Sequence, residues 1–122
     1  MRENIAREKS LAFSIRIVNL HKYLRNVKRE YTLSNQVLRS GTSIGANISE
    51  AEYALSDRDM FSKLHIALKE ASETQYWLEL LYHTAYLSER EYRSLLSECI
   101  ELKRLLIAST NTLAKKVEVQ KD

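Results

Sequence analysis

The sequence predicts an all-α protein, specifically an antiparallel up-down-up-down four-helix bundle. Apolar residues recur at alternating spacings of four and three along four segments, the pattern of helices that pack side by side. The 122-residue chain has no proline and only two glycines, so few residues oppose a helix. Short links between the segments make consecutive helices antiparallel neighbours. One domain, residues 1–122, is expected, with helices at about 4–30, 35–54, 57–86 and 89–117.

The first helix carries two apolar stripes. The first stripe consists of Phe13, Ile17, Leu20, Leu24, Val27 and Tyr31, and the second of Leu11, Ile15 and Val18. One stripe is enough to face a bundle core. The second stripe therefore either widens the core or faces another molecule.

The second helix contains both glycines. Ser34 is the expected N-cap, and Gly41 falls on an apolar seam with Ile44 and Ile48, while Gly45 lies one turn on. Each glycine in a helix interior costs about 1 kcal/mol relative to alanine. Close approach of another helix would offset that cost. A large side chain of the third helix, such as Trp77 or Tyr82, is one candidate to fill the notch.

A polar stripe runs beside this seam. Ser43, Asn47 and Glu50 recur at spacings of four and three. Half-buried polar groups need hydrogen-bond partners, so a structural network is expected, with Arg39 or a basic residue of the first helix pairing with Glu50. A phosphate-binding loop is not expected, because no strand and no Walker or dinucleotide glycine pattern is present. The predicted helix-packing motif comprises Gly41, Ser43, Ile44, Gly45, Asn47, Ile48 and Glu50.

The third and fourth helices have recognisable start signals. Ser56 with Asp59, and Ser88 with Glu91, have the spacing of N-terminal caps. The fourth helix seam includes Cys99, and the final residues KKVEVQKD are expected to fray.

Composition excludes several classes of protein. No run of eighteen apolar residues could span a bilayer, and the charged start MRENIAREKS is not a signal peptide. A single cysteine cannot form an internal disulfide. We therefore expect a cytoplasmic protein without a membrane role.

No catalytic, cofactor or metal site is expected. The chain has no Glu-x-x-His pair of the kind that di-iron bundles use. Glu79 and His83 are one turn apart, but His21 and His65 have no acidic residue at that spacing. Cys99 lies on an apolar seam, where a thiol behaves as a small hydrophobic group. The chain is thus predicted to be neither an enzyme nor a binder of small-molecule substrates.

The first quarter of the chain is basic. Residues 1–31 hold eight Lys or Arg against three Glu, a net charge of +5. Lys22, Arg25 and Arg29 recur at helical spacing, and two tyrosines that could stack on bases, Tyr23 and Tyr31, are interleaved with them. A solvated helix edge is the alternative. The candidate nucleic-acid-binding residues are Lys22, Arg25, Lys28, Arg29, Lys103 and Arg104.

Self-association is also expected. The third helix carries an aromatic and aliphatic cluster of the kind that is enriched at oligomer interfaces. Together with the second stripe of the first helix, it exceeds what one seam can bury, unless both fill a wide core. The candidate interface residues are Tyr76, Trp77, Leu80 and Leu81.

Two stretches, LRSGTSIGANISEAE and KLHIALKEASETQYWLELL, resemble the four-helix-bundle proteins encoded in intervening sequences of bacterial 23S rRNA genes. The resemblance covers residues 11–115, and its sharpest part is Ser43, Ile44, Asn47, Ile48 and Glu50. It implies a closed ring, typically a pentamer. Related bundles are accessory proteins of diversity-generating retroelements that bind a reverse transcriptase through a basic barrel. Here Ala51 leads into EYALSDRD, which lacks the arginine-rich turn of many members.

We therefore expect a non-enzymatic homo-oligomeric scaffold, pentameric by resemblance, that binds RNA or a nucleoprotein through a basic face. A protein–protein adaptor without a nucleic-acid role is the alternative. The two differ in whether binding to RNA weakens steeply as salt increases.

Overall fold

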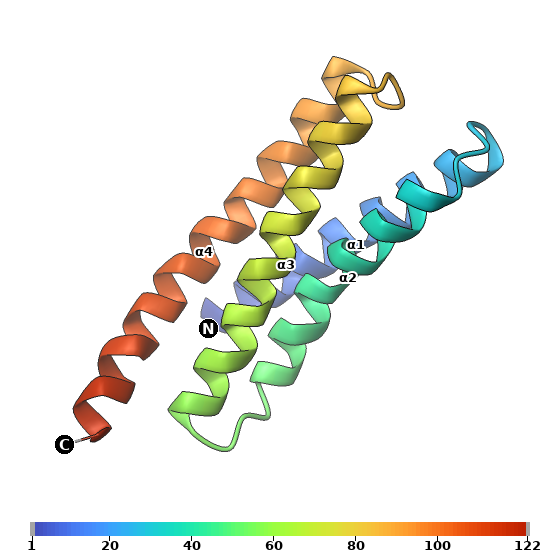
Figure 1. Cartoon of the computed structure of the whole chain (residues 1–122). Coiled ribbons are helices and arrows are strands. Elements are labelled where there is room, and N and C mark those ends of the chain that lie inside the picture. The colour runs from blue at the N-terminus through green and yellow to red at the C-terminus, as the bar shows by residue number, and fades with distance from the viewer. Residues whose placement is uncertain (1, 122) are drawn as a thin grey trace.

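The computed structural model describes the backbone of residues 2–121 and the side chains of residues 5–120. It contains four α-helices and, within those residues, no strand. They are α1 (Arg2–Asn26), α2 (Thr32–Ala51), α3 (Asp57–His83) and α4 (Glu89–Lys121). The α1–α2 and α3–α4 turns lie at one end of the molecule, and the α2–α3 turn lies toward the other (Figure 1). The predicted all-α four-helix fold is confirmed.

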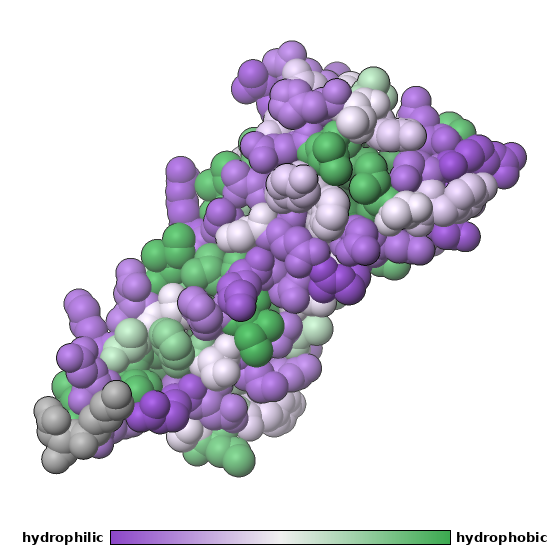
Figure 2. Space-filling model, viewed as in Figure 1, coloured by the Kyte–Doolittle hydropathy of each residue, from purple (hydrophilic) through white to green (hydrophobic). Residues whose placement is uncertain are grey.

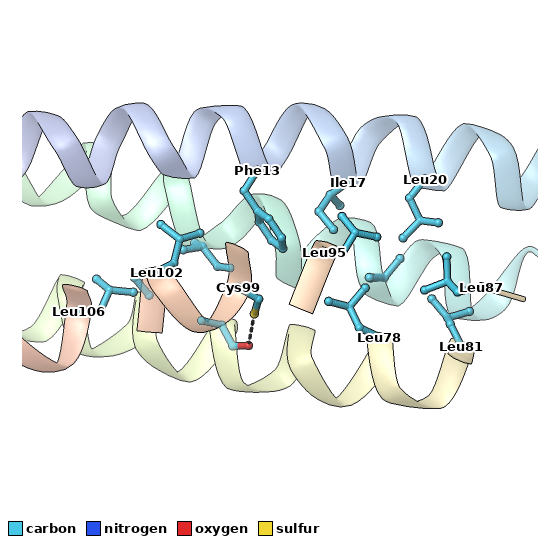
Figure 3. Close-up of a cluster of buried hydrophobic side chains, with 14 of the residues drawn as sticks. Phe13, Ile17, Leu20, Leu78, Leu81, Leu87, Leu95, Cys99, Leu102 and Leu106 are labelled. Atoms are coloured by element: carbon cyan, nitrogen blue, oxygen red, sulfur yellow. Dashed lines mark hydrogen bonds between the residues drawn. The ribbon is translucent and has the colours of Figure 1, made fainter. Parts of the chain in front are cut away.

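Side chains from all four helices form the core. Phe13, Ile17 and Leu20 point from α1 toward the interior, where they face residues of α3 and α4 (Figure 3). Burying one such side chain contributes about 1.5–3 kcal/mol. Leu81, predicted at an oligomer interface, is fully buried in this core. The interface prediction is therefore wrong for Leu81, whose side chain faces the core between the helices rather than solvent.

The α1–α2 connection is longer than predicted. Helix α1 ends at Asn26 rather than near residue 30, so Val27 and Tyr31 leave the core seam and are 64% and 47% exposed. Helix α2 starts at Thr32 rather than residue 35. The Glu30 carboxylate accepts the backbone N–H groups of Leu33 and Ser34 at 3.1 and 2.8 Å. Glu30, not Ser34, satisfies these N–H groups.

Ser34 was predicted as the N-cap of α2 but lies inside the helix. Its hydroxyl oxygen is buried and makes no hydrogen bond within the described part of the chain. Helix α2 also ends earlier than predicted, at Ala51 rather than residue 54. Leu55, which continues the apolar spacing of Ile44 and Ile48, is therefore 95% exposed.

The caps of α3 and α4 are confirmed. The Ser56 hydroxyl accepts the Asp59 N–H at 3.1 Å. Ser88 and Glu91 form a reciprocal capping box, with bonds of 3.0 and 3.1 Å. Helix α4 continues to Lys121 rather than ending near residue 117, and the Gln120 amide donates to Asp57 of α3 at 2.8 Å. The last residue of the segment predicted to fray, Asp122, lies outside the described residues.

Both glycines face α1, and the candidate occupants from α3, Trp77 and Tyr82, are not their nearest neighbours. A Cβ atom added at Gly41 would lie 2.9 Å from both Cγ atoms of Ile17, and one at Gly45 would lie 3.2 Å from the Ser10 hydroxyl. Gly41 is buried and receives Ile17, so the close approach predicted for α2 is confirmed with a different partner. The absence of side chains at the two glycines thus allows α1 and α2 to pack closely against each other.

The polar stripe of α2 does not form the expected network. Ser43 and Asn47 donate to carbonyls of their own helix, those of Arg39 and Ser43, at 2.7 and 2.8 Å. Glu50 is 58% exposed and pairs with Lys63 of α3 at 3.0 Å, so Arg39 is not its partner. Local side-chain to backbone bonds satisfy Ser and Asn on a helix without a second helix.

Helix α3 ends in a Schellman motif whose key residue is not glycine. The Tyr86 N–H donates to the Leu81 carbonyl at 2.9 Å and the Ala85 N–H to the Tyr82 carbonyl at 3.1 Å. Ala85 has φ of 69°, so α3 stops at His83 rather than residue 86. Glycine is the usual residue at this position because it has no Cβ atom to clash.

We expect Ala85→Gly to raise the free energy of unfolding by about 1 kcal/mol, since alanine pays a steric cost in the left-handed region that glycine does not. Urea unfolding followed by circular dichroism measures the change. Thr84→Gly is the matched control: Thr84 has φ of −104° and its hydroxyl bonds the Leu80 carbonyl at 2.6 Å, so this change should be destabilising. Equal destabilisation by both substitutions would contradict the strain.

Candidate nucleic-acid interface

Four cationic side chains gather where α1 ends and the chain turns into α2. Lys22, Lys28 and Arg29 are exposed, and Arg25 is half-buried. Arg29 has φ of 58°, the left-handed conformation that turns the chain toward α2. None of these four residues forms an ion pair with any residue that the structure describes. Because α1 ends at Asn26, only Lys22 and Arg25 have the predicted helical spacing, while Lys28 and Arg29 lie in the turn that follows. The four residues are referred to below as the basic surface.

Two tyrosines lie against these cations. The Arg25 guanidinium lies 5.0 Å from the centre of the Tyr31 ring, and the Lys28 ammonium 5.9 Å from the Tyr23 ring. Both rings are partly exposed, at 47% and 37%. A cation and the face of an aromatic ring attract each other. These contacts therefore hold the charged groups beside flat rings of the kind that bases stack on.

Glu30, which follows Arg29 in the chain, does not neutralise this surface by ion pairing. Both of its oxygens accept backbone N–H groups of α2. The described acidic residues that form ion pairs do so elsewhere on the bundle, in contacts such as Arg7–Glu52, Lys9–Glu101, Arg16–Glu98 and Arg39–Glu70.

Lys103 and Arg104 do not join this surface. Lys103 is fourteen residues from the start of α4, which is about 21 Å along the helix axis. The start of α4 lies at the same end of the molecule as the α1–α2 turn (Figure 1). The Lys103 ammonium donates to the Gln75 amide oxygen of α3 at 2.9 Å, while Arg104 is exposed. These two residues form part of a separate surface on α4.

The aromatic cluster of α3 is largely packed against the protein itself. The Trp77 indole N–H donates to Glu73 at 2.9 Å, and its ring is partly buried against the core. A hydrogen bond from Arg39, and to a smaller extent the one from Trp77, holds the pKa of Glu73 below its usual range. Leu80 is half-buried, and only Tyr76, at 57%, is largely exposed. On the face shown in Figure 2, hydrophobic areas are small and interrupted by hydrophilic residues.

The second stripe of α1 is the larger exposed apolar feature. Leu11 and Ile15 are 61% and 55% exposed, and Val18 is half-buried. A groove of about 230 Å³ runs beside Leu11 between α1 and α2. Its small lining residues include Ser10, Ser14, Thr42, Gly45, Ala46 and Ser49. The stripe could be predicted from helical periodicity. The groove could not be predicted, because it combines residues of two helices and neither helix has a sequence pattern that indicates it.

Cys99 is not available as a nucleophile in the folded protein. Burial raises the pKa of its thiol to about 11, and its sulfur donates to the Ala71 carbonyl oxygen at 3.3 Å (Figure 3). A buried neutral thiol is chemically inert, because the thiolate is the reactive form.

Two further features of the described residues concern metals and membranes. No group of three or more His, Cys, Asp or Glu side chains is placed to hold a metal ion. Likewise, within residues 2–121 none of the helices has an apolar stretch long enough to cross a bilayer.

Comparisons with a family model and with a solved structure agree on the family. The family model described as "23S rRNA-intervening sequence protein" matches residues 2–108. A crystal structure of a protein of unknown function from the S23 ribosomal protein family of Bacteroides thetaiotaomicron is 52% identical. The similarity covers 91% of this chain and 99% of that one, with a TM-score of 0.89. No match was found among curated proteins.

Proposed function

This chain belongs to the 23S rRNA-intervening sequence protein family, and we propose that it is a non-enzymatic oligomeric scaffold that binds RNA, alone or within a nucleoprotein. The basic surface at the α1–α2 turn, formed by Lys22, Arg25, Lys28 and Arg29, is the proposed contact.

The observation that carries this proposal is the set of four cations without ion-pair partners beside two exposed tyrosine rings. Other described cations, such as Arg58, Lys69, Lys115 and Lys116, also have no carboxylate partner, but both cation–aromatic contacts of the described residues, Arg25–Tyr31 and Lys28–Tyr23, belong to this surface. When Lys and Arg side chains neutralise phosphates, the counterions condensed on the nucleic acid are released. This release supplies most of the affinity of binding that does not depend on nucleotide sequence.

Assembly would multiply this contact. The exposed Leu11 and Ile15, beside a groove of small side chains, form the surface best suited to a second copy of the chain. The resemblance to ring-forming bundles supports a pentamer. A ring carries one basic surface per copy, so that a weak individual site gains avidity on a long RNA.

Filter binding of single-stranded RNA across a salt series tests the proposal. Each phosphate contact on a single strand contributes about 0.7 to the slope of log affinity against log salt. We expect the joint change of Lys22, Arg25, Lys28 and Arg29 to alanine to reduce that slope by about 3 per chain engaged. The matched control replaces four cations outside this surface, Arg58, Lys69, Lys115 and Lys116, and should leave most of the slope.

Equal losses in the two variants would mean that net charge alone, and not this surface, attracts RNA. Binding by neither the variants nor the wild type would favour the protein–protein adaptor, whose contact surface would then be the exposed stripe of α1.

A further inference from the structure

A second cavity lies next to the basic surface and is distinct from the groove between α1 and α2. It has a volume of about 310 Å³ and opens between α1 and the start of α4. Its floor consists of Leu20, Leu87 and Leu95, which are between 4% and 7% exposed. All three belong to the core cluster: Leu20 comes from α1, Leu87 from the turn between α3 and α4, and Leu95 from α4 (Figure 3). Tyr23 forms one wall and Asn19 lies at the rim.

We propose that this cavity binds one unpaired base of a single-stranded RNA, whose backbone is held by the neighbouring cations. This inference rests on the proposed RNA-binding function and adds the form of RNA and the residue that distinguishes it.

The size and lining of the cavity suit a small planar apolar surface. Sites for drug-sized ligands are roughly 300–1,000 Å³ and mostly apolar with a few polar groups, so a cavity of about 310 Å³ holds only a small ligand. An aromatic side chain beside an apolar floor is the arrangement that single-strand binding proteins use to stack bases. Tyr23 supplies the ring and the three leucines supply the opposite surface.

The same tyrosine connects the cavity to the phosphate-binding surface. The Lys28 ammonium lies 5.9 Å from the Tyr23 ring centre. A nucleotide whose base enters the cavity therefore has its phosphate within reach of a cation that has no carboxylate partner among the described residues. Continuity with the basic surface is what favours a nucleotide over an uncharged apolar ligand.

Asn19 supplies an amide that can contact the edge of a base. Of the charged side chains at the cavity, Arg16 bonds Ser94 and Glu98, and one carboxylate oxygen of Glu91 accepts the Ser88 N–H. Asn19 is exposed and makes no side-chain hydrogen bond with the residues that the structure describes. Its amide both donates and accepts, as the edges of all bases require.

Bases in a duplex are stacked and paired, so they cannot enter a cavity of this kind without being flipped out. The cavity therefore predicts a preference for single strands that the cationic surface alone would not produce.

The test compares three RNA probes by fluorescence anisotropy at fixed salt: an eight-nucleotide single strand, the same strand with all bases removed, and a duplex. We expect Tyr23→Ala to weaken binding of the base-bearing single strand by about tenfold, within the range for loss of one stacked base. Binding of the abasic strand and the duplex should change less than twofold. Tyr23→Phe, which keeps the ring, should bind like wild type. Tyr53→Ala is the matched control, because Tyr53 is 84% exposed but lies outside both the cavity and the basic surface.

A second readout follows the base directly. A 2-aminopurine in the single strand should lose fluorescence on binding wild type but not on binding Tyr23→Ala. Equal weakening of all three probes by Tyr23→Ala, or no weakening of any, would refute the base-binding cavity while leaving RNA binding intact. Failure of wild type to bind any probe would refute the proposed function and this inference together.

Discussion

Replacing Gly41 by alanine is expected to lower the free energy of unfolding by about 2 kcal/mol. The added Cβ would lie 2.9 Å from both Cγ atoms of Ile17 and 3.3 Å from its Cβ. Ile17 is fully buried and branched at Cβ, so it cannot rotate away and α1 must move. Overpacking of this kind costs about 1–3 kcal/mol, and the gain of about 1 kcal/mol in helix propensity offsets only part of it.

Gly45→Ala is the matched control, one turn away on the same face. There the new Cβ would meet the Ser10 hydroxyl at 3.2 Å and the Ser10 Cβ at 3.4 Å, and the hydroxyl can rotate. We expect its stability to stay within about 1 kcal/mol of wild type. Urea unfolding measures both variants. If the two substitutions had the same effect, the close contact between Gly41 and Ile17 would not be a determinant of the α1–α2 packing.

Leu11→Gln together with Ile15→Gln is expected to convert the proposed homo-oligomer into a 14.2 kDa monomer. Both side chains are more than half exposed in the isolated chain, so the change should scarcely alter the stability of the bundle. Burial of each in an interface would contribute about 1.5–3 kcal/mol. In a ring the same loss occurs at every interface, so that assembly should fail at micromolar concentration.

Size-exclusion chromatography with light scattering measures the mass. The control substitutes Ile107 and Val119 of α4 by glutamine, since these residues are 43% and 73% exposed on a different helix. That variant should elute like wild type. A wild-type mass of 14.2 kDa would remove the ring altogether, and an unchanged mass of the Leu11 and Ile15 variant would move the interface to another surface.

Much of the candidate RNA surface followed from α1 alone. Lys22, Arg25 and Tyr23 lie on one helix, where fixed spacing determines which side chains are neighbours. The same reasoning could not place Lys103 of α4. Its distance from the basic surface depends on how α4 packs beside α1 and on how far along α4 the residue lies. The cavity was not predicted, since its residues come from α1, α4 and the turn between α3 and α4.

The sequence by itself determined the fold class, the four helices, two of the helix caps and the family, because these depend on periodicity and on contacts within about four residues. Only the tertiary structure decided that the glycines receive Ile17, that Leu81 belongs to the core, and that Leu11 and Ile15 remain exposed. Those outcomes depend on how each helix is rotated about its own axis relative to its neighbours. That rotation is set by contacts between residues that are far apart in the chain.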